Sequence, residues 1–328
     1  MDNSAPSAIG PESTHKSGKV VQTNGATSFI GGSIHKMKGL AYITTCKGRL
    51  SHLQESLPRI AEQLNIECIV VDYGCPERCG DWVEAHFPSV RVVRTGPTDG
   101  FNASRARNVG ASVARAAWLG FFDADILVDS TFSARVIPAL KEGNYYRAHP
   151  VTDQTWGTLI CHRSDFERVE GYDEAYTGWG GEDDDLITFL SLHGVKQMGF
   201  PAALLSEIAH SDEQRTRFCE IQDKWLQSQI NQMYLQAKLD LYRLRGAPIN
   251  RRDAVALFAE IQRTLSTMED PSGAGKTVHI TLPLSLIGSP VQDGLRQISE
   301  LQRTLSYTLR VKERIPNRGI PPSNIECI

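Results

Sequence analysis

Four short apolar runs, separated by segments with helical spacing, constrain the fold of this chain more than any other feature. Isoleucine, valine and aromatic residues dominate these runs, which is typical of buried strands. The runs are residues 39–45, 66–72, 90–93 and 118–125. Between them, apolar side chains recur at helical spacing over residues 50–64, 82–87 and 102–118. Strands that alternate with helices predict an α/β domain with a mostly parallel sheet flanked by helices.

Polar side chains follow these predicted strands at the points where they end. Thr45 and Asp72 close the first and second strands, and Asp123-Ala-Asp125 closes the fourth. Open α/β sheets bind ligands at the carboxyl ends of their strands, so we expect these residues to share a site. The carboxylates of Asp123 and Asp125 are hard oxygen ligands that suit Mg²⁺ or Mn²⁺ clamped on phosphates. A strand-end turn with two solvated acids is the alternative interpretation.

Residues 176–185, with the sequence YTGWGGEDDD, place four consecutive acids behind a Trp-Gly-Gly turn. Such a run is usually a solvated surface, but the residues before it argue for a site. Trp179 offers an aromatic platform, and Gly180-Gly181 lets the backbone approach a ligand closely. Apolar residues with helical spacing follow Asp185, so the acids fall at a helix N-terminus, where the helix dipole favours negative charge. Stacking surfaces and clustered carboxylates, including a general base, are what sugar chemistry uses.

The charge and composition of the 328 residues exclude several classes of partner. A net charge of −3 and a pI near 6.3 give no electrostatic case for binding nucleic acid. No apolar run approaches the ~20 residues of a membrane span, and the N-terminus has no apolar secretory core. Seven cysteines, most of them single in apolar surroundings, fit a reducing compartment, so we expect a cytoplasmic protein. Cys75 and Cys79 flank Pro-Glu-Arg, a weak metal signal for which a plain loop is the preferred interpretation.

Composition divides the chain into three predicted parts. Residues 1–37 are rich in Ser, Gly, Thr and Asn and are predicted to be a disordered leader. Residues 38–218 hold the α/β domain, and residues 219–328 form a mainly helical C-terminal extension. Within the extension, the spacing of apolar residues predicts helices over 220–245, 253–268 and 291–314 and a strand over 277–282.

The last predicted helix, residues 291–314, is basic and amphipathic. Such a helix could pack on the core, join two copies of the chain, or touch an anionic membrane surface where lipid-linked acceptors lie. Packing is the default interpretation. A homodimer through the C-terminal helices and a peripheral contact with the inner face of the membrane stay open.

Four motifs in a fixed order carry a resemblance to a known family. They are FNASRARNVG at residues 101–110, FFDAD at 121–125, GWGGEDDD at 178–185, and His210-Ser-Asp followed by Arg217-Phe218. In this order they resemble the GT-A glycosyltransferases, most closely the β-1,4-galactosyltransferases and the related domains of bacterial family 2 enzymes such as chondroitin polymerase. The resemblance covers roughly residues 39–218 and implies a GT-A, Rossmann-like fold.

The resemblance implies a metal centre and a nucleotide site. Asp125 and His210 would be the protein ligands of a Mn²⁺ (or Mg²⁺) cofactor, with the donor pyrophosphate filling the remaining positions. Where the galactosyltransferases place a Met three residues before this His, the chain has Glu207, and whether its carboxylate joins the metal is open. The positions implied to surround the nucleotide are Thr45, Asp72, Arg107, Asn108 and Asp123.

The resemblance also implies roles within the acid run. Glu182 would contact the donor sugar, Asp183 would be the general base, and Asp184 would hold acceptor hydroxyls. Further contacts with substrate are implied for Gly157, Trp179, Gly180 and Gly181. Gly157 belongs to a donor-sugar wall that aligns poorly with the family, so the identity of the donor sugar is left open.

These features together predict an inverting, metal-dependent glycosyltransferase that moves a sugar from a nucleotide-diphosphate donor, UDP-linked by expectation, to a glycan or glycoconjugate. Its partners would be these two substrates and no nucleic acid. A retaining transferase on the same fold is one alternative. A catalytically silent sugar or nucleotide binder is another, although it would have no need of a general base. A nucleotidyltransferase would want a first loop richer in Gly, Lys and Arg than Thr44-Thr-Cys-Lys-Gly-Arg49.

Overall fold

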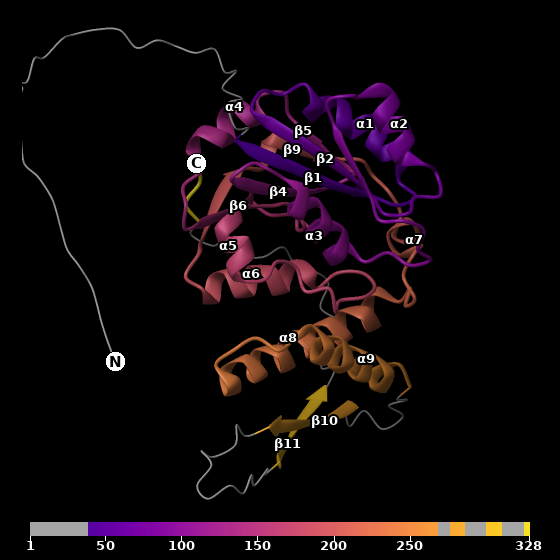
Figure 1. The fold of residues 1–328 in the computed structure, drawn as a ribbon, viewed down its shortest axis with the longest axis vertical. Coiled ribbons are helices and arrows are strands. Elements are labelled where there is room, and N and C mark those ends of the chain that lie inside the picture. The colour runs from indigo at the N-terminus through magenta and orange to yellow at the C-terminus, as the bar shows by residue number, and fades with distance from the viewer. Residues whose placement is uncertain (1–38, 268–275, 286–299, 310–324) are drawn as a thin grey trace, which may run out of the picture. The chain divides into compact units, whose positions relative to one another are not determined.

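The computed structural model describes residues 39–267, 276–285, 300–309 and 325–328. The predicted disordered leader, residues 1–37, lies outside these residues. The main sheet has seven strands in the order β3-β2-β1-β4-β7-β6-β8. Its strands are β1 (Leu40–Cys46), β2 (Ile66–Asp72), β3 (Arg91–Arg94), β4 (Trp118–Asp123), β6 (Asn144–His149), β7 (Leu159–His162) and β8 (Lys196–Pro201). Strands β1, β2, β4 and β6 of this sheet are labelled in Figure 1.

The sheet is mostly parallel, as predicted. Strands β1 to β4 pair in parallel, whereas β7 runs antiparallel to both β4 and β6, and β6 and β8 are again parallel. In the register of the sheet, Thr45 lies opposite Val71 on β2 and Asp123 on β4. The carboxyl ends of β1, β2 and β4 therefore coincide, and the polar residues that close these strands share one edge.

Two apolar clusters cover the two faces of this sheet. Along β1, Leu40 and Tyr42 belong to one cluster, and the alternate residues Ala41 and Ile43 belong to the other. The first cluster includes residues of α1 (Leu50–Ala61), α2 (Cys79–His86) and α4 (Phe132–Val136). The second includes residues of α3 (Ala103–Val113), α5 (Arg163–Arg168) and α6 (Glu182–Leu192). The sheet is thus flanked by helices on both faces.

A second, short antiparallel pair, β5 (Ile126–Val128) with β9 (Leu205–Glu207), lies beside the main sheet. Strand β5 begins directly after Asp125, and β9 ends three residues before His210. This pairing therefore brings two segments together that lie far apart in the sequence. The remaining short helices are η1 (Ile137–Ala139), η2 (Ala202–Leu204) and α7 (Asp212–Thr216).

Two long helices, α8 (Lys224–Arg245) and α9 (Arg251–Thr267), begin the C-terminal extension, close to their predicted positions. Their apolar faces form a third cluster, which also contains Ala175 and Tyr176 from the segment that leads into the acid run. The described residues belong to one compact unit. The two helices therefore pack on the segment that carries the predicted active site.

The helix predicted over residues 291–314 is wrong where the structure can test it. Residues Glu300–Leu309 form a strand, β11, which pairs antiparallel with β10 (Lys276–Ser285), and the rest of the predicted range lies outside the described residues. Leu301, Leu305 and Leu309 are spaced four apart, which fits a helix face and one face of a strand equally well. Pairing with β10, which is rich in β-branched residues, favours the strand over the helix at Glu300–Leu309. The predicted dimer and membrane contacts rested on this helix and lose that support.

None of the helices that the structure describes combines the length and the apolar content needed to cross a bilayer.

Candidate active site

The four acids of the run fill the first turn of α6, which begins at Glu182 as the sequence predicts. Their carboxylates do not share one surface: Glu182, Asp183 and Asp185 are buried, and Asp184 is exposed. Each buried acid has a basic partner, described below. The solvated-surface interpretation of this run is therefore wrong.

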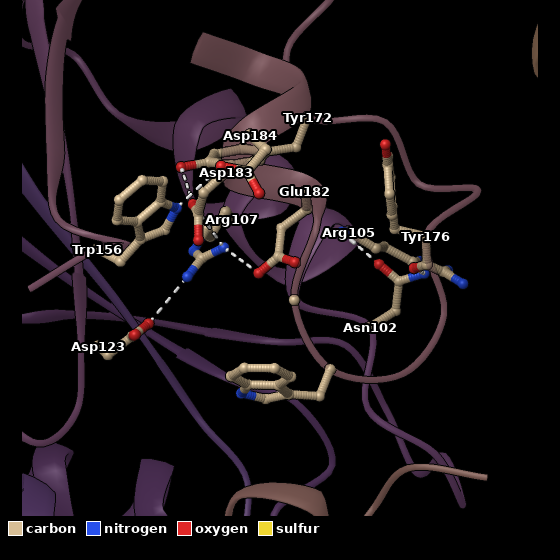
Figure 2. Close-up of polar contacts among 12 residues, drawn as sticks. Asn102, Arg105, Arg107, Asp123, Trp156, Tyr172, Tyr176, Glu182, Asp183 and Asp184 are labelled. Carbon is tan, nitrogen blue, oxygen red and sulfur yellow. Dashed lines mark hydrogen bonds and ion pairs between the residues drawn. The ribbon is translucent and has the colours of Figure 1, made fainter. Parts of the chain in front are cut away.

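Arg107, on α3, joins three of the predicted site carboxylates. Its Nη1 lies 2.8 Å from Glu182 Oε1 and 3.3 Å from Asp183 Oδ1, and its Nη2 lies 2.9 Å from Asp123 Oδ1 (Figure 2). Burial alone would lower the pKa of Arg107, but Asp183, Tyr172 and Asp123 hold it well above its ordinary value. A permanently charged guanidinium thus connects the end of β4 to the start of α6.

Asp183 has the environment of a general base. Burial raises the pKa of Asp183 to about 7, against the opposing effect of Arg107 and with a further increase from Glu182 and Asp123. The Tyr172 hydroxyl donates to Asp183 Oδ1 across 3.4 Å. Since a carboxylate is the most effective proton acceptor when its pKa lies near the working pH, this value suits proton transfer from a hydroxyl group.

The backbone of Gly157 passes close to the same carboxylates. A Cβ atom on this residue would lie 3.1 Å from Asp183 Oδ2, 3.2 Å from Asp123 Oδ2 and 3.3 Å from Arg107 Nη2. The loop that precedes β7 therefore packs so tightly on these groups that a side chain at this position would force them to shift. The substrate contact implied for Gly157 stays a prediction.

Trp156, which adjoins Gly157 in the implied donor-sugar wall, lines the site. Arg147 also lines it but was not identified from the sequence. Trp156 Nε1 donates to Asp184 Oδ1 across 3.0 Å (Figure 2). The Arg147 guanidinium, on β6, lies 4.4 Å from the centroid of the Trp156 ring and donates to the Trp156 carbonyl across 2.6 Å. No sequence signal identifies Arg147, because a single Arg between Tyr146 and Ala148 on β6 does not reveal what its side chain will contact.

The chain turns after β4, so Asp123 and Asp125 point to different partners. Asp123 meets Arg107, whereas Asp125 Oδ2 lies 3.2 Å from His210 Nδ1 and 3.7 Å from Arg49 Nη1. The predicted metal pair is therefore brought together across the β5–β9 pairing. His210 Nδ1 also lies 3.0 Å from the carbonyl oxygen of Ile208, and His210 Nε2 accepts from Arg215 Nε across 2.9 Å.

The Asp125–His210 pair fits a hard divalent cation. In an octahedral site with metal–ligand bonds of roughly 2.1 Å, neighbouring ligand atoms lie about 3 Å apart, close to the 3.2 Å measured here. Binding of a metal at either imidazole nitrogen would replace the contact with Ile208 or with Arg215. Among the described residues, no third acid, His or Cys completes a group of three with this pair, and Glu207 is exposed on β9. The remaining ligands would have to come from the donor.

Two residues implied to bind the nucleotide, Asp72 and Asn108, form side-chain hydrogen bonds with backbone groups of nearby loops. Asp72 accepts from the backbone N–H groups of Cys75 and Gly80, at 2.8 Å and 3.1 Å, one with each oxygen. Asn108 exchanges two hydrogen bonds with the backbone of Tyr172, at 2.8 Å and 2.9 Å. Thr45 is half-buried at the carboxyl end of β1. Their contacts with a nucleotide stay predictions.

Helix α8 holds the glycine-rich turn before the acids. Asn231 Nδ2 donates to the carbonyl oxygens of Trp179 and Gly180, at 3.0 Å and 2.7 Å. Gly181 has a φ of 90°, and a Cβ atom there would lie 2.7 Å from the Asn231 Cβ. Glycine is thus required at Gly181 for the approach of α8, and the ligand contact expected at this residue stays a prediction. Gly180 keeps an open side, because its nearest neighbour would be 3.9 Å away.

Trp179 is half-buried in this turn, and the Lys224 ammonium lies 4.0 Å from the centroid of its ring. A cavity of about 300 Å³ lies beside the turn. Aromatic rings and amide groups line it, a combination that suits recognition of a nucleotide base or a sugar. These side chains are Tyr73, Phe101, Phe218, Asn102, Gln227 and Gln262.

Comparison with known proteins gives two family matches and a set of distant relatives. Residues 42–174 match the model of glycosyl transferase family 2, and residues 144–213 match the model described as the N-terminal domain of galactosyltransferase. Validoxylamine A glucosyltransferases of two Streptomyces hygroscopicus subspecies, limoneus and jinggangensis, are each 26% identical to the chain. The matches cover 54% and 48% of this chain, and 51% and 52% of those proteins. The chain thus spans about half the length of the curated relatives it matches.

Among solved structures, S. aureus TarS is similar with a TM-score of 0.47 and 13% identity, over 68% of this chain and 71% of that one. The mannosyltransferase PcManGT from Pyrobaculum calidifontis, solved with GDP-Man and Mn²⁺, gives a TM-score of 0.44 and 15% identity, over 72% and 77%. The family 2 model includes the Asp-x-Asp motif, and the galactosyltransferase model includes the acid run. Residues 42–213 therefore form a glycosyltransferase domain.

Proposed function

We propose that the chain is a metal-dependent inverting glycosyltransferase that moves a sugar from a nucleotide-diphosphate donor to a hydroxyl group of a glycan or glycoconjugate. The observation that carries this proposal is the state of Asp183. It is a buried carboxylate that Arg107 holds beside Glu182 and Asp123, and burial raises its pKa to about 7.

The proposed reaction uses Asp183 as the base. An acceptor hydroxyl loses its proton to Asp183 while its oxygen attacks the anomeric carbon from the face opposite the departing nucleotide. The other acids support this arrangement: Arg107 fixes Glu182 and Asp123 around the base, and exposed Asp184 faces incoming acceptor. The reaction is a single displacement without a covalent intermediate with the enzyme. Because the attack comes from the face opposite the departing nucleotide, the configuration of the anomeric carbon inverts.

Asp125 and His210 are the residues proposed to hold Mn²⁺ or Mg²⁺, and a bound cation would supply Lewis-acid stabilisation of the charge on a departing diphosphate. Arg49 lies 3.7 Å from Asp125 and is placed to add positive charge beside the same phosphates. The proposal follows from the chemistry of this donor set, which matches a hard cation.

For the substrates, a UDP-linked sugar is the proposed donor. Glucose is the first sugar to test, because the curated relatives are named glucosyltransferases. Their name makes validoxylamine A an acceptor to test beside oligosaccharides. A cytoplasmic location is part of the same proposal, because the enzyme would draw its UDP-linked donor from the cytoplasm.

The experiment is a matrix of nucleotide sugars and acceptors, each with Mn²⁺, Mg²⁺ or chelator, in which nucleotide release and glycosylated product are both measured. Product whose anomeric configuration, read by NMR, is opposite to that of the donor supports the proposal. Retention of configuration would favour the retaining alternative. Binding of a nucleotide sugar without release or transfer under every condition would favour the silent binder.

A further inference from the structure

Three buried cysteines lie close together at the edge of the sheet where β1 and β2 end. Cys46 is the last residue of β1, Cys75 lies in the connection after β2, and Cys79 is the first residue of α2. Their three sulfur atoms all lie within 4.8 Å of one another, and all three side chains are buried. The sequence pair Cys75 and Cys79 alone favoured a plain loop, but the fold adds Cys46 as a third thiol.

The spacing of the sulfur atoms is close to that of a thiolate metal site. Zinc–sulfur bonds of about 2.3 Å in a tetrahedral site place sulfur atoms roughly 3.8 Å apart, so the cluster needs movements of about 1 Å or less. The cluster is also connected to the backbone. The N–H of Gly48 donates to Cys75 Sγ across 3.2 Å, the kind of outer contact that orients and stabilises a metal-bound thiolate.

We propose that Cys46, Cys75 and Cys79 bind one zinc ion through three thiolates, with the fourth position left to water or another small ligand. The site is chemically distinct from the Asp125–His210 pair, because thiolates select soft cations and carboxylate oxygens select hard ones. The proposed zinc ion has a structural role, because it connects the loop after β1, which carries Arg49, to the loop after β2. The proposed zinc site does not depend on the glycosyltransferase reaction.

The experiment uses the full chain purified under reducing conditions with added zinc. Bound metal is counted by mass spectrometry, and cobalt is then substituted so that thiolate-to-cobalt charge-transfer absorption reports sulfur ligands. We expect one ion per chain, a charge-transfer band as strong as three thiolates produce, and a melting temperature that falls when a zinc chelator is added, because bound metal stabilises the folded state. Excess Mn²⁺ should not displace the ion.

Single variants Cys46→Ser, Cys75→Ser and Cys79→Ser should each weaken the band and release the metal. Cys161→Ser is the matched control, because Cys161 is equally buried but belongs to the cluster on the other face of the sheet. If a serine variant does not fold, the cobalt titration of the unaltered chain decides alone. The proposal is overturned if the unaltered chain shows no charge-transfer band, or if the band survives in a folded serine variant of Cys46, Cys75 or Cys79. It is also overturned if two of these thiols are found as a disulfide.

Discussion

The Lys238 ammonium on α8 lies 2.8 Å from both carboxylate oxygens of Asp185, the last acid of the run on α6. The same ammonium lies 2.7 Å from Asp173 Oδ2, to which the Tyr234 hydroxyl also donates. Helix α8 therefore supplies the counter-charge for one of the four crowded acids. The C-terminal extension and the acid run are in this respect a single unit.

Removing this charge should destabilise the protein strongly. In Lys238→Met, Asp185 and Asp173 are left as buried acids without a cation, a change that typically costs about 3–5 kcal/mol. The free energy of unfolding, from urea denaturation followed by circular dichroism, measures the loss. Arg243→Met on the same helix is the control, since Arg243 is exposed and its pair with Asp240 should contribute little. Equal, small changes in the two variants would contradict the account.

Asn231 is predicted to position the catalytic turn and not merely to stabilise α8. Asn231→Ala removes two hydrogen bonds to the carbonyl oxygens of Trp179 and Gly180, and each unsatisfied carbonyl costs about 1–3 kcal/mol. With an active donor and acceptor, we expect kcat to fall at least tenfold at temperatures where the variant remains folded. Gln232→Ala, exposed one residue further along α8, should behave as the unaltered chain. A folded Asn231→Ala variant with full kcat would contradict the positioning role of Asn231.

The sequence predicted the parts of the fold that local pattern determines. Strand β2 has the predicted bounds, and the helix N-terminus at Glu182 follows from acids that precede an apolar helical pattern. It could also place Asp123 and Asp125 at a strand end, because parallel strands align their carboxyl ends. The resemblance to the family, rather than the pattern, led to His210.

The contacts that the sequence did not reveal are between segments far apart in the chain. Arg107 as the common partner of three acids, Lys238 beneath Asp185, and Cys46 beside Cys75 all depend on tertiary packing. A long polar side chain on a helix carries no signal of what it will meet. The wrong helix at residues 300–309 has a related cause, since pairing with β10 overrode a spacing that fits two structures.

The raised pKa of Asp183 predicts how activity depends on pH. A base must be ionised to accept a proton, so kcat/KM should rise with pH and level off above an apparent pKa of about 7. Rates measured from pH 5 to pH 9 with Mg²⁺ as the metal provide the test. A profile that is flat across this range would show that no group with this pKa limits the reaction.

The raised pKa of Asp183 also predicts how stability depends on pH. Stability should fall over the pH range in which activity rises. Because the pKa of Asp183 is higher in the folded chain than the ordinary ~4, the folded state holds this proton more tightly than the unfolded state. Its contribution to stability is therefore lost as pH rises from about 4 to about 7. Asp183→Asn should remove this loss, so its melting temperature relative to the unaltered chain should be higher at pH 8 than at pH 5.

Metal and nucleotide are predicted to bind as a unit. Asp125 and His210 provide only two ligands, so phosphate oxygens must fill the remaining positions of an octahedral cation. Titration calorimetry should show that UDP binds much more weakly when a chelator is present, and Asp125→Ala should reproduce this effect with metal in excess. UDP affinity that does not change with chelator would remove Asp125 and His210 from the nucleotide site.

The proposed reaction depends most on Asp183 as the base. Substitution of three neighbouring acids tests this role most directly. Asp183→Asn keeps the size of the side chain but cannot accept a proton, so kcat should fall by about 10²–10⁴-fold while donor affinity stays the same. Glu182→Gln should instead weaken binding of the nucleotide sugar but not of UDP, and Asp184→Asn should raise the KM for the acceptor. Three equal losses of only a few-fold would contradict the central claim, because they are what a run of acids without separate roles would give.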